Sequence, residues 1–295
     1  ASCLVGSEMC IRDSDSLMIL DTMTLEELIL EIKTDFKEVR GRWNKFLPKF
    51  KKIIQKRTRY PWLWDTTIKT RRYNEWYLSF FADSKKEVNI VRPSFTLCFT
   101  YQGQPWAGTV IDGQVLLFPS HFFERYGERC LKIHKDQAIA AGKDMMKLFF
   151  IMNSNCCFFN NQKGDNVRGY CYDGMFLGDW INENGGIVKT FISRKEMKIN
   201  QFTEYFELLK LWIIQDMFEI RKGTSLSSSM TKYIPETYFD HEEWNKFLFE
   251  RGNQRLIKAS EESNEIYRDN ESEYRKCLKM IDAVNQNRYD QEINY

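Results

Sequence analysis

The stretch 106-WAGTVIDGQVLLFPSHFFERYGER-129 predicts a β-hairpin that leads directly into a helix. Residues 106–111 and 114–118 are apolar and rich in β-branched side chains, and the Asp112-Gly113 pair between them is a strong signal for a tight hairpin turn. Ser120 follows the second strand and is a candidate N-terminal cap for the helix. Strands followed by helices in this order predict the α+β class.

The same kinds of pattern recur on both sides of this stretch. Strands are expected at 76–81, 94–101, 167–172, 175–181 and 187–193. A second helix is expected from Lys135, with a buried side made of Ile139, Met146, Phe149 and Phe150. A further apolar helix is expected at 202–220. The predicted fold therefore has N-terminal helices, an antiparallel sheet with a two-helix insertion, and a helical C-terminal extension.

The N-terminal region also carries helix signals. Thr24 and Glu27 have the spacing of a capping box, and apolar residues at helical spacing follow over 24–44. Pro48 starts or bends a second, basic helix, whose apolar face contains Phe50, Ile53 and Ile54. The aromatic stretch YPWLWDTT at 60–67 is interpreted as a loop or short turn.

These signals divide the chain into five segments. They are an artefactual and disordered start (1–17), a basic helical arm (18–74), an α+β core (75–221), a Gly- and Ser-rich linker (222–232) and an acidic helical extension (233–295).

Residues 3–14 resemble the translation of a sequencing-library adapter. Its codons encode Leu4 to Asp13 in order, and the flanking partial codons permit Cys3 and Ser14. The stretch lacks the apolar run of a signal peptide, and its two cysteines match no metal-ligand spacing. We therefore expect these residues to be an artefact of assembled environmental DNA.

Composition excludes several classes of protein. Hydrophobic residues make up 43% of the chain, which is enough for a packed core, and no apolar run reaches the roughly 18 residues that suggest a membrane span. Six of the eight cysteines lie outside residues 3–14 and show no C-x-x-C spacing. Reduced thiols in a cytoplasmic protein that is not membrane-bound are the simplest expectation.

Charge is unevenly distributed, although the net charge is only +2. Residues 33–72 contain fourteen Lys or Arg and three acids, whereas residues 234–295 contain fourteen acids and nine bases. One interpretation is an anionic partner for the basic arm, with the acidic segment acting as a self-masking or antitoxin-like element. The other is that both segments are simply solvated helix faces.

The helix at 120–129 carries the most informative chemistry. On a helix, His121, Arg125 and Glu128 share one face, with Glu124 and Arg129 on its flanks. An imidazole beside guanidinium groups suits an anionic substrate, since imidazole moves protons near neutral pH and arginine binds phosphate through a planar fork. The alternative is a set of ordinary surface salt bridges between residues three or four positions apart.

The string H-x-x-E-R-x-x-E-R at 121–129, with Thr190 in IVKTFIS at 187–193, resembles a known class over about 118–193. The class is the small toxin-like domains of the barnase/EndoU/colicin/RelE-like ribonucleases. The resemblance implies metal-independent RNA cleavage, in which the ribose 2′-hydroxyl attacks the adjacent phosphate. It implies catalytic roles for His121, Arg125, Arg129 and Thr190, and substrate contacts from Glu128 and Lys189.

The basic arm would then hold flanking RNA. The residues expected to bind phosphates by charge are Lys49, Lys52, Lys56 and Arg57. Trp62 and Trp64 either stack on bases or pack in the core, and core packing is the more common role for such side chains.

No cofactor or metal is expected. Cys130, His134, Cys156, Cys157 and Cys171 contain no ligand pair with zinc-site spacing, and Asp165, Asp173 and Asp179 are interpreted as turn residues. The sequence contains neither a P-loop nor a dinucleotide-binding fingerprint. Two alternatives to a ribonuclease stay open: a non-enzymatic nucleic-acid- or partner-binding protein of a mobile element, and a purely structural α+β protein.

Overall fold

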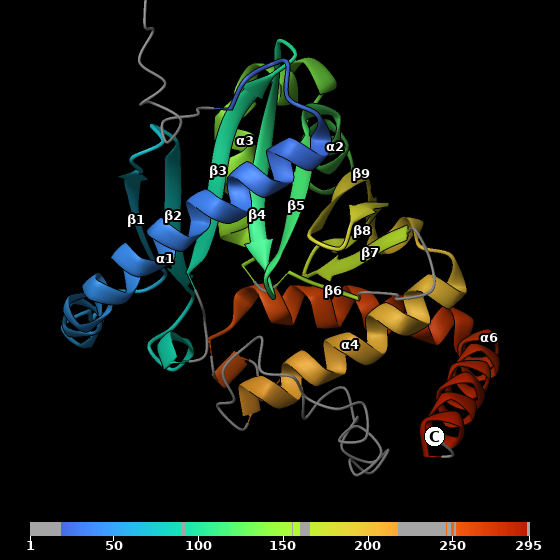
Figure 1. Ribbon diagram of the computed structural model, residues 1–295. Coiled ribbons are helices and arrows are strands. Elements are labelled where there is room, and N and C mark those ends of the chain that lie inside the picture. Colours follow the sequence, from blue (N-terminus) through green and yellow to red (C-terminus); the bar gives the residue numbers. More distant parts are fainter. Residues whose placement is uncertain are drawn as a thin grey trace, which may run out of the picture.

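The computed structural model describes residues 19–89, 93–154, 156–159, 166–217, 246, 249–250 and 252–293 (Figure 1). The predicted artefact at 1–17 and the predicted linker at 222–232 lie outside these residues. The described part combines one large sheet with helices on its two faces, which confirms the α+β class.

The sheet has nine described strands in the order β1-β2-β3-β4-β5-β9-β8-β7-β6. Their bounds are β1 Trp62–Lys69, β2 Glu75–Ala82, β3 Ser94–Tyr101, β4 Gln104–Ile111, β5 Gln114–Pro119, β6 Cys157–Phe159, β7 Asn166–Cys171, β8 Gly174–Asn182 and β9 Gly185–Ser193. Neighbours are antiparallel except β5 and β9, which are parallel. The predicted antiparallel pairing therefore holds for every neighbouring pair except this one, where two antiparallel meanders join side by side.

Two strands were not expected from the sequence. β1 occupies most of the stretch interpreted as a loop, and it pairs with β2 along its whole length, so the boundary proposed at 74 falls inside a hairpin. Trp62 is buried and Leu63 is 45% exposed, which is the alternation of a strand with one face in the core. β6 has only three residues, too few to give a periodic signal.

The described helices are α1 Leu25–Gln55, α2 Ser120–Tyr126, α3 Lys135–Met152, α4 Ile199–Met217 and α6 Gln254–Ile293. Short turns of 3-10 helix lie at η1 Glu87–Asn89 and η3 Arg194–Glu196, and a π-helical turn, η2, lies at Gly127–Leu131. None of the helices in the described ranges is both long and apolar enough to cross a membrane.

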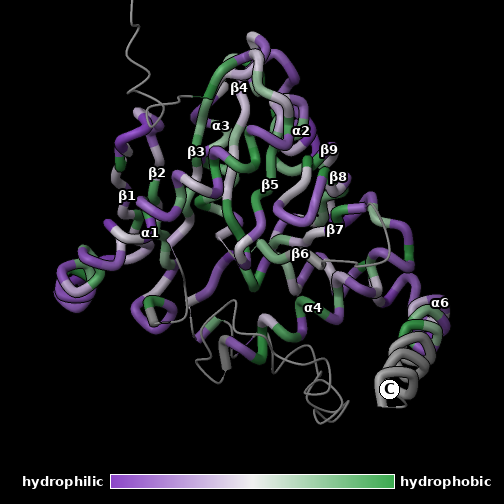
Figure 2. Tube along the Cα trace, in the orientation of Figure 1, coloured by the Kyte–Doolittle hydropathy of each residue, from purple (hydrophilic) through white to green (hydrophobic). Residues whose placement is uncertain are grey.

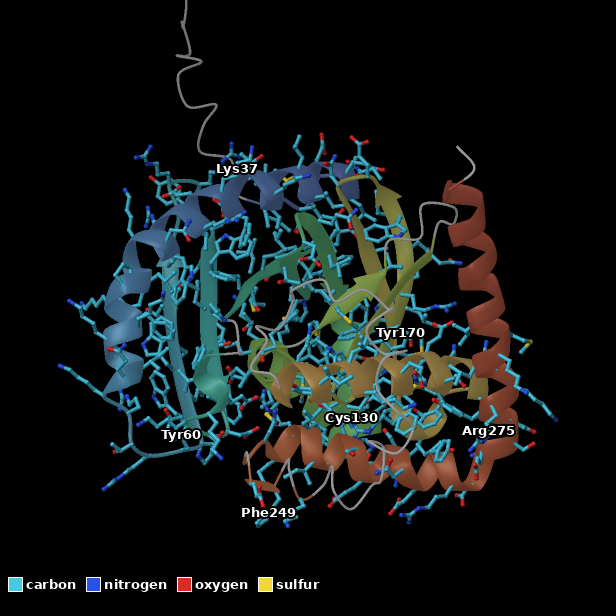
Figure 3. All side chains as sticks on the ribbon, turned by 90° about the horizontal axis from the view of Figure 1, so that it is seen from below. Lys37, Tyr60, Cys130, Tyr170, Phe249 and Arg275 are labelled. Carbon is cyan, nitrogen blue, oxygen red and sulfur yellow. The ribbon has the colours of Figure 1, made fainter. Side chains whose placement is uncertain are left out.

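α1 is one continuous helix that contains Pro48, rather than two helices. Its N-terminus has the expected capping box, in which Thr24 and Glu27 each accept a hydrogen bond from the other's backbone N–H. The helix curves, and its second half turns along β1 (Figure 3). A proline inside a helix permits such a bend because it supplies no backbone N–H to the preceding turn.

Three apolar clusters fill the space between the sheet and the helices. α2 and α3 cover one face, and on the other face α1 packs over β1–β5 while α4 and α6 pack over β7–β9. Apolar stretches accordingly run through the central strands in Figure 2. Trp62 and Trp64 pack against Phe50 in the α1 cluster, which confirms core packing over base stacking.

One predicted core position on α3 is wrong. Met146, Phe149 and Phe150 are buried as expected, but Ile139 is 51% exposed. Gly142 has non-helical backbone angles (φ 46°, ψ −118°) within α3. This break shifts the phase of the helix, so Ile139 no longer shares a face with the residues that follow.

Candidate active site on helix α2

α2 is short and anchored by its apolar side. Phe122, Phe123 and Tyr126 are buried against the sheet and α3, so His121 and Arg125 are left on the exposed side. Pro119 occupies the N-cap position without a side-chain hydrogen bond, so Ser120 is the first helical residue rather than the cap that was expected.

His121 is held by the neighbouring strand β9. Its Nε2 lies 2.7 Å from the backbone oxygen of Lys189. A carbonyl oxygen can only accept, so Nε2 must carry the proton and donate it. In the neutral ring, Nδ1 is then left with a free lone pair. The imidazole is therefore exposed, fixed in one tautomer, and equipped with one proton acceptor.

The carbonyl of Lys189 is available because β9 is bulged at this point. Thr190 pairs with Leu177 on β8, and Val188 pairs with Gly178, so Lys189 has no partner on β8. Such a bulge interrupts the ladder and redirects one residue, and bulges are over-represented next to active sites. Gly178 is needed opposite it, because a Cβ there would lie 1.9 Å from the backbone oxygen of Ile187.

We expect Gly178→Ala to lower the free energy of unfolding by about 1–3 kcal/mol, because the added methyl group must displace the β9 backbone. Gly41→Ala on α1 is the matched control, since a Cβ there meets no atom within 4 Å. That control should gain about 0.5–1 kcal/mol from its better helix propensity. Urea unfolding of both variants measures the two effects, and equal stabilities would show that Gly178 is not sterically required.

Arg125 and Arg129 differ in their surroundings. Arg125 is 54% exposed and its Nη1 lies 3.6 Å from Glu128 Oε2, an exposed pair of the kind that contributes little to stability. Arg129 is only 27% exposed, donates to the backbone oxygen of Phe191, and lies 3.5 Å from Glu196. Arg125 is thus accessible to an anion although it pairs weakly with Glu128, whereas Arg129 has a structural contact that the sequence did not predict.

Glu196, in η3 directly after β9, balances the positive charge of Arg129. Partial burial acts to raise the pKa of Glu196, but hydrogen bonds from Ser193 and the charge of Arg129 outweigh it and lower the pKa. This carboxylate therefore stays ionised and fastens Arg129 to η3.

The remaining predicted residues of this region lie on β9 or beside α2. Lys189 is exposed and forms an ion pair with Asp179 on β8, while Thr190 is half-buried beside the bulge. Glu124 is directed to Lys135 rather than to Arg129, at 3.5 Å. The surface salt-bridge interpretation is therefore realised only in part, at the Arg125–Glu128 pair.

The four predicted phosphate-binding residues of the basic arm are not near His121. They lie at the end of α1, which packs over β1 and β2, whereas α2 packs on β9 on the opposite face. Five strand spacings separate β1 from β9, or about 24 Å. Lys49, Lys52, Lys56 and Arg57 therefore lie apart from the α2–β9 site, and their predicted role in holding flanking RNA stays a prediction.

A buried polar cluster behind α2 was also missed. Tyr126 donates to Asp173 Oδ2 at 2.8 Å, and Asn153 donates to the same oxygen at 3.1 Å while accepting from the Asp173 backbone at 3.2 Å. Burial, and then the charge of Asp173, raise the pKa of Tyr126 well above its usual value, so the phenol stays protonated and donates. The cluster ties α2 to α3 and to the β7–β8 turn.

The cysteines and histidines do not converge on a metal position. The Cys130 thiol contacts the backbone oxygen of Asp173 at 3.6 Å, and His134 caps α3. Within the described ranges, no group of three or more His, Cys, Asp or Glu side chains is arranged to hold a metal ion.

No protein-family model matches the chain, and no curated protein or solved structure matches it. The chemistry of the α2–β9 site is therefore inferred from its own residues.

Proposed function

We propose that this protein is a metal-independent endoribonuclease that cuts RNA phosphodiesters at the α2–β9 site. The observation that supports it best is the hydrogen bond from His121 Nε2 to the Lys189 carbonyl, because it leaves Nδ1 as an exposed proton acceptor. Arg125 lies one helical turn away, and Lys189, whose ammonium group pairs with Asp179, is the residue that supplies the carbonyl. Attack on a phosphodiester requires a general base that takes the proton of the hydroxyl and cations that stabilise the charge on the phosphate.

In the proposed reaction, His121 Nδ1 takes the proton of a ribose 2′-hydroxyl. The 2′-oxygen forms a bond to the adjacent phosphorus, and the bond from phosphorus to the 5′-oxygen of the next nucleotide breaks. That oxygen takes a proton from solvent. Arg125 and Lys189 stabilise the charge on the non-bridging oxygens, and the products are a 2′,3′-cyclic phosphate and a 5′-hydroxyl.

The described cysteines outside the start of the chain are all free thiols. This supports a reducing compartment, and we place the proposed activity in the cytoplasm.

The wild-type chain should cut an end-labelled RNA and leave a cyclic phosphate, and a single 2′-deoxy substitution should abolish the cut at that position because the nucleophile is missing. EDTA should not change the rate, since no step uses a metal. Product ends are identified by mass spectrometry. Cutting at the 2′-deoxy position, dependence on a divalent metal, or no cutting of any RNA would each contradict the proposal.

A further inference from the structure

The second half of α1 carries the strongest uncompensated charge in the described part of the chain. Residues 45–59 contain seven Lys or Arg and no acid. All seven are exposed, and none forms an ion pair with another described residue. The charge is therefore available to an external anion.

Four of the seven cations lie in one line. Lys45, Lys49, Lys52 and Lys56 fall within about 60° of the helix circumference, and they span about 16 Å along its axis. We call these four residues the lysine stripe. Its members are spaced by three or four residues, so the ammonium groups repeat about every 5–6 Å.

The helix under the stripe is fixed in orientation by aromatic packing. Phe46 stacks on Trp64 with ring centroids 5.6 Å apart, and Phe50 contacts Trp64 at 4.6 Å and Trp62 at 6.2 Å. Because this side is held against β1, the lysine side is directed outward. Figure 3 shows nitrogen-tipped side chains extending away from this part of α1.

The acidic C-terminal helix does not cover the stripe. α6 packs against α4 and η3, and its far end lies beside the β6–β9 half of the sheet, whereas the stripe lies at the β1 edge (Figure 1). The described part of the predicted self-masking segment begins beside the end of β2, where Arg255 pairs with Asp83 and Glu87, and then continues along α4, away from the stripe.

We propose that the lysine stripe is a docking site for the phosphate backbone of double-stranded RNA, separate from the α2–β9 site. A regular line of ammonium groups complements a backbone with one charge per nucleotide. Single strands are usually held by stacking on exposed aromatic side chains, but Trp62 is buried and the half-buried Trp64 already packs on Phe46 and Phe50. An interfacial membrane helix inserts an apolar face, whereas the apolar side chains of this half of α1 pack against the sheet.

The choice of RNA over DNA rests on the proposed function, because the lysine stripe would contact only phosphates, which both nucleic acids carry. The two sites lie on opposite faces of the sheet, so a bound duplex would be held at one face while a flexible extension is cut at the other. Binding of the duplex at the stripe is therefore independent of which nucleotide occupies the active site.

The test measures binding of a His121→Asn protein to a fluorescent RNA hairpin by anisotropy, so that cleavage does not interfere. With four phosphate contacts, log affinity should fall with log salt with a slope of roughly −2.8 to −3.6. Between about 50 and 200 mM salt this is a loss of about 50- to 150-fold. Changing all four stripe lysines to Gln should remove most of this dependence and most of the binding.

The matched control changes four other exposed lysines to Gln: Lys85, Lys143, Lys258 and Lys276. It alters net charge equally, so it should keep the salt slope. Equal loss in both variants, unchanged binding in the stripe variant, tighter binding to single-stranded RNA, or stronger binding to phosphatidylserine vesicles would each overturn the inference. Salt-dependent hairpin binding by a chain that never cuts RNA would instead uphold the stripe and contradict the ribonuclease proposal.

Discussion

Replacing His121 by asparagine is expected to lower the rate of RNA cleavage by about 100- to 10,000-fold, the usual contribution of a general acid–base group. His121 is exposed and its one hydrogen bond is to the Lys189 carbonyl, so the shorter asparagine should remove the proton acceptor while the rest of the local structure survives. The affinity for RNA should change little, because the imidazole does not supply the charge that binds phosphate. Single-turnover cleavage and anisotropy measure the two quantities separately.

His134→Asn is the control for this experiment. His134 is also exposed and accepts a hydrogen bond from the Asp136 backbone as the N-cap of α3, a role that asparagine performs well. This variant should cleave at the parent rate. A His121→Asn rate within a few-fold of the parent would show that His121 does not transfer the proton.

Arg255→Met is expected to lower the free energy of unfolding by about 3–5 kcal/mol, the typical result of removing one partner from a buried ion pair. Arg255 Nε lies 3.0 Å from Asp83 and Nη2 lies 3.1 Å from Glu87, and all three side chains are at most 7% exposed. Methionine has a similar volume, so the loss should come from two carboxylates left buried without a cation. Urea unfolding at neutral pH measures it.

Arg275→Met on the same helix is the control, because its pair with Glu271 is half exposed and should contribute little to stability. The pH dependence of the stability lost in Arg255→Met is a second check. Burial raises the pKa of Asp83, against the lowering effect of Arg255, so removing Arg255 should raise it further. A raised folded-state pKa makes the protein relatively more stable below that pKa. The deficit of Arg255→Met should therefore shrink at about pH 4, and an equal deficit at both pH values would contradict this account.

Local signals were sufficient to predict the centre of the fold. The Asp112-Gly113 turn fixes the register of β4 and β5, and helical periodicity indicates the helices on either side of η2, although the predicted cap of α2 was wrong. These features depend on residues close together in sequence. β1 was missed because Trp62, Leu63 and Trp64 are all apolar, so the sequence shows no alternation there and the one-sided burial appears only in the fold.

The candidate site was predicted only as far as one helix face. His121 and Arg125 are neighbours because four residues make about one turn, which any sequence with this spacing would show. The Lys189 carbonyl, however, is 68 residues from His121, and it is exposed by a bulge that depends on Gly178. Asp173 is 47 residues from Tyr126. Such contacts follow from the parallel pairing of β5 with β9, for which the sequence offers no local signal.

The second half of α1 has a further consequence for how the protein behaves at high concentration. β1 ends the sheet on one side, and the unpaired backbone of such a strand can recruit a strand from another molecule and start aggregation. α1 runs beside this edge with its aromatic side chains on Trp62 and Trp64, and it surrounds the edge with like charges that repel a second copy. At the opposite edge, β6 is too short to act as a template. We therefore expect the lysine stripe to oppose self-association as well, and a variant that lacks its four charges should precipitate at a lower concentration than the parent.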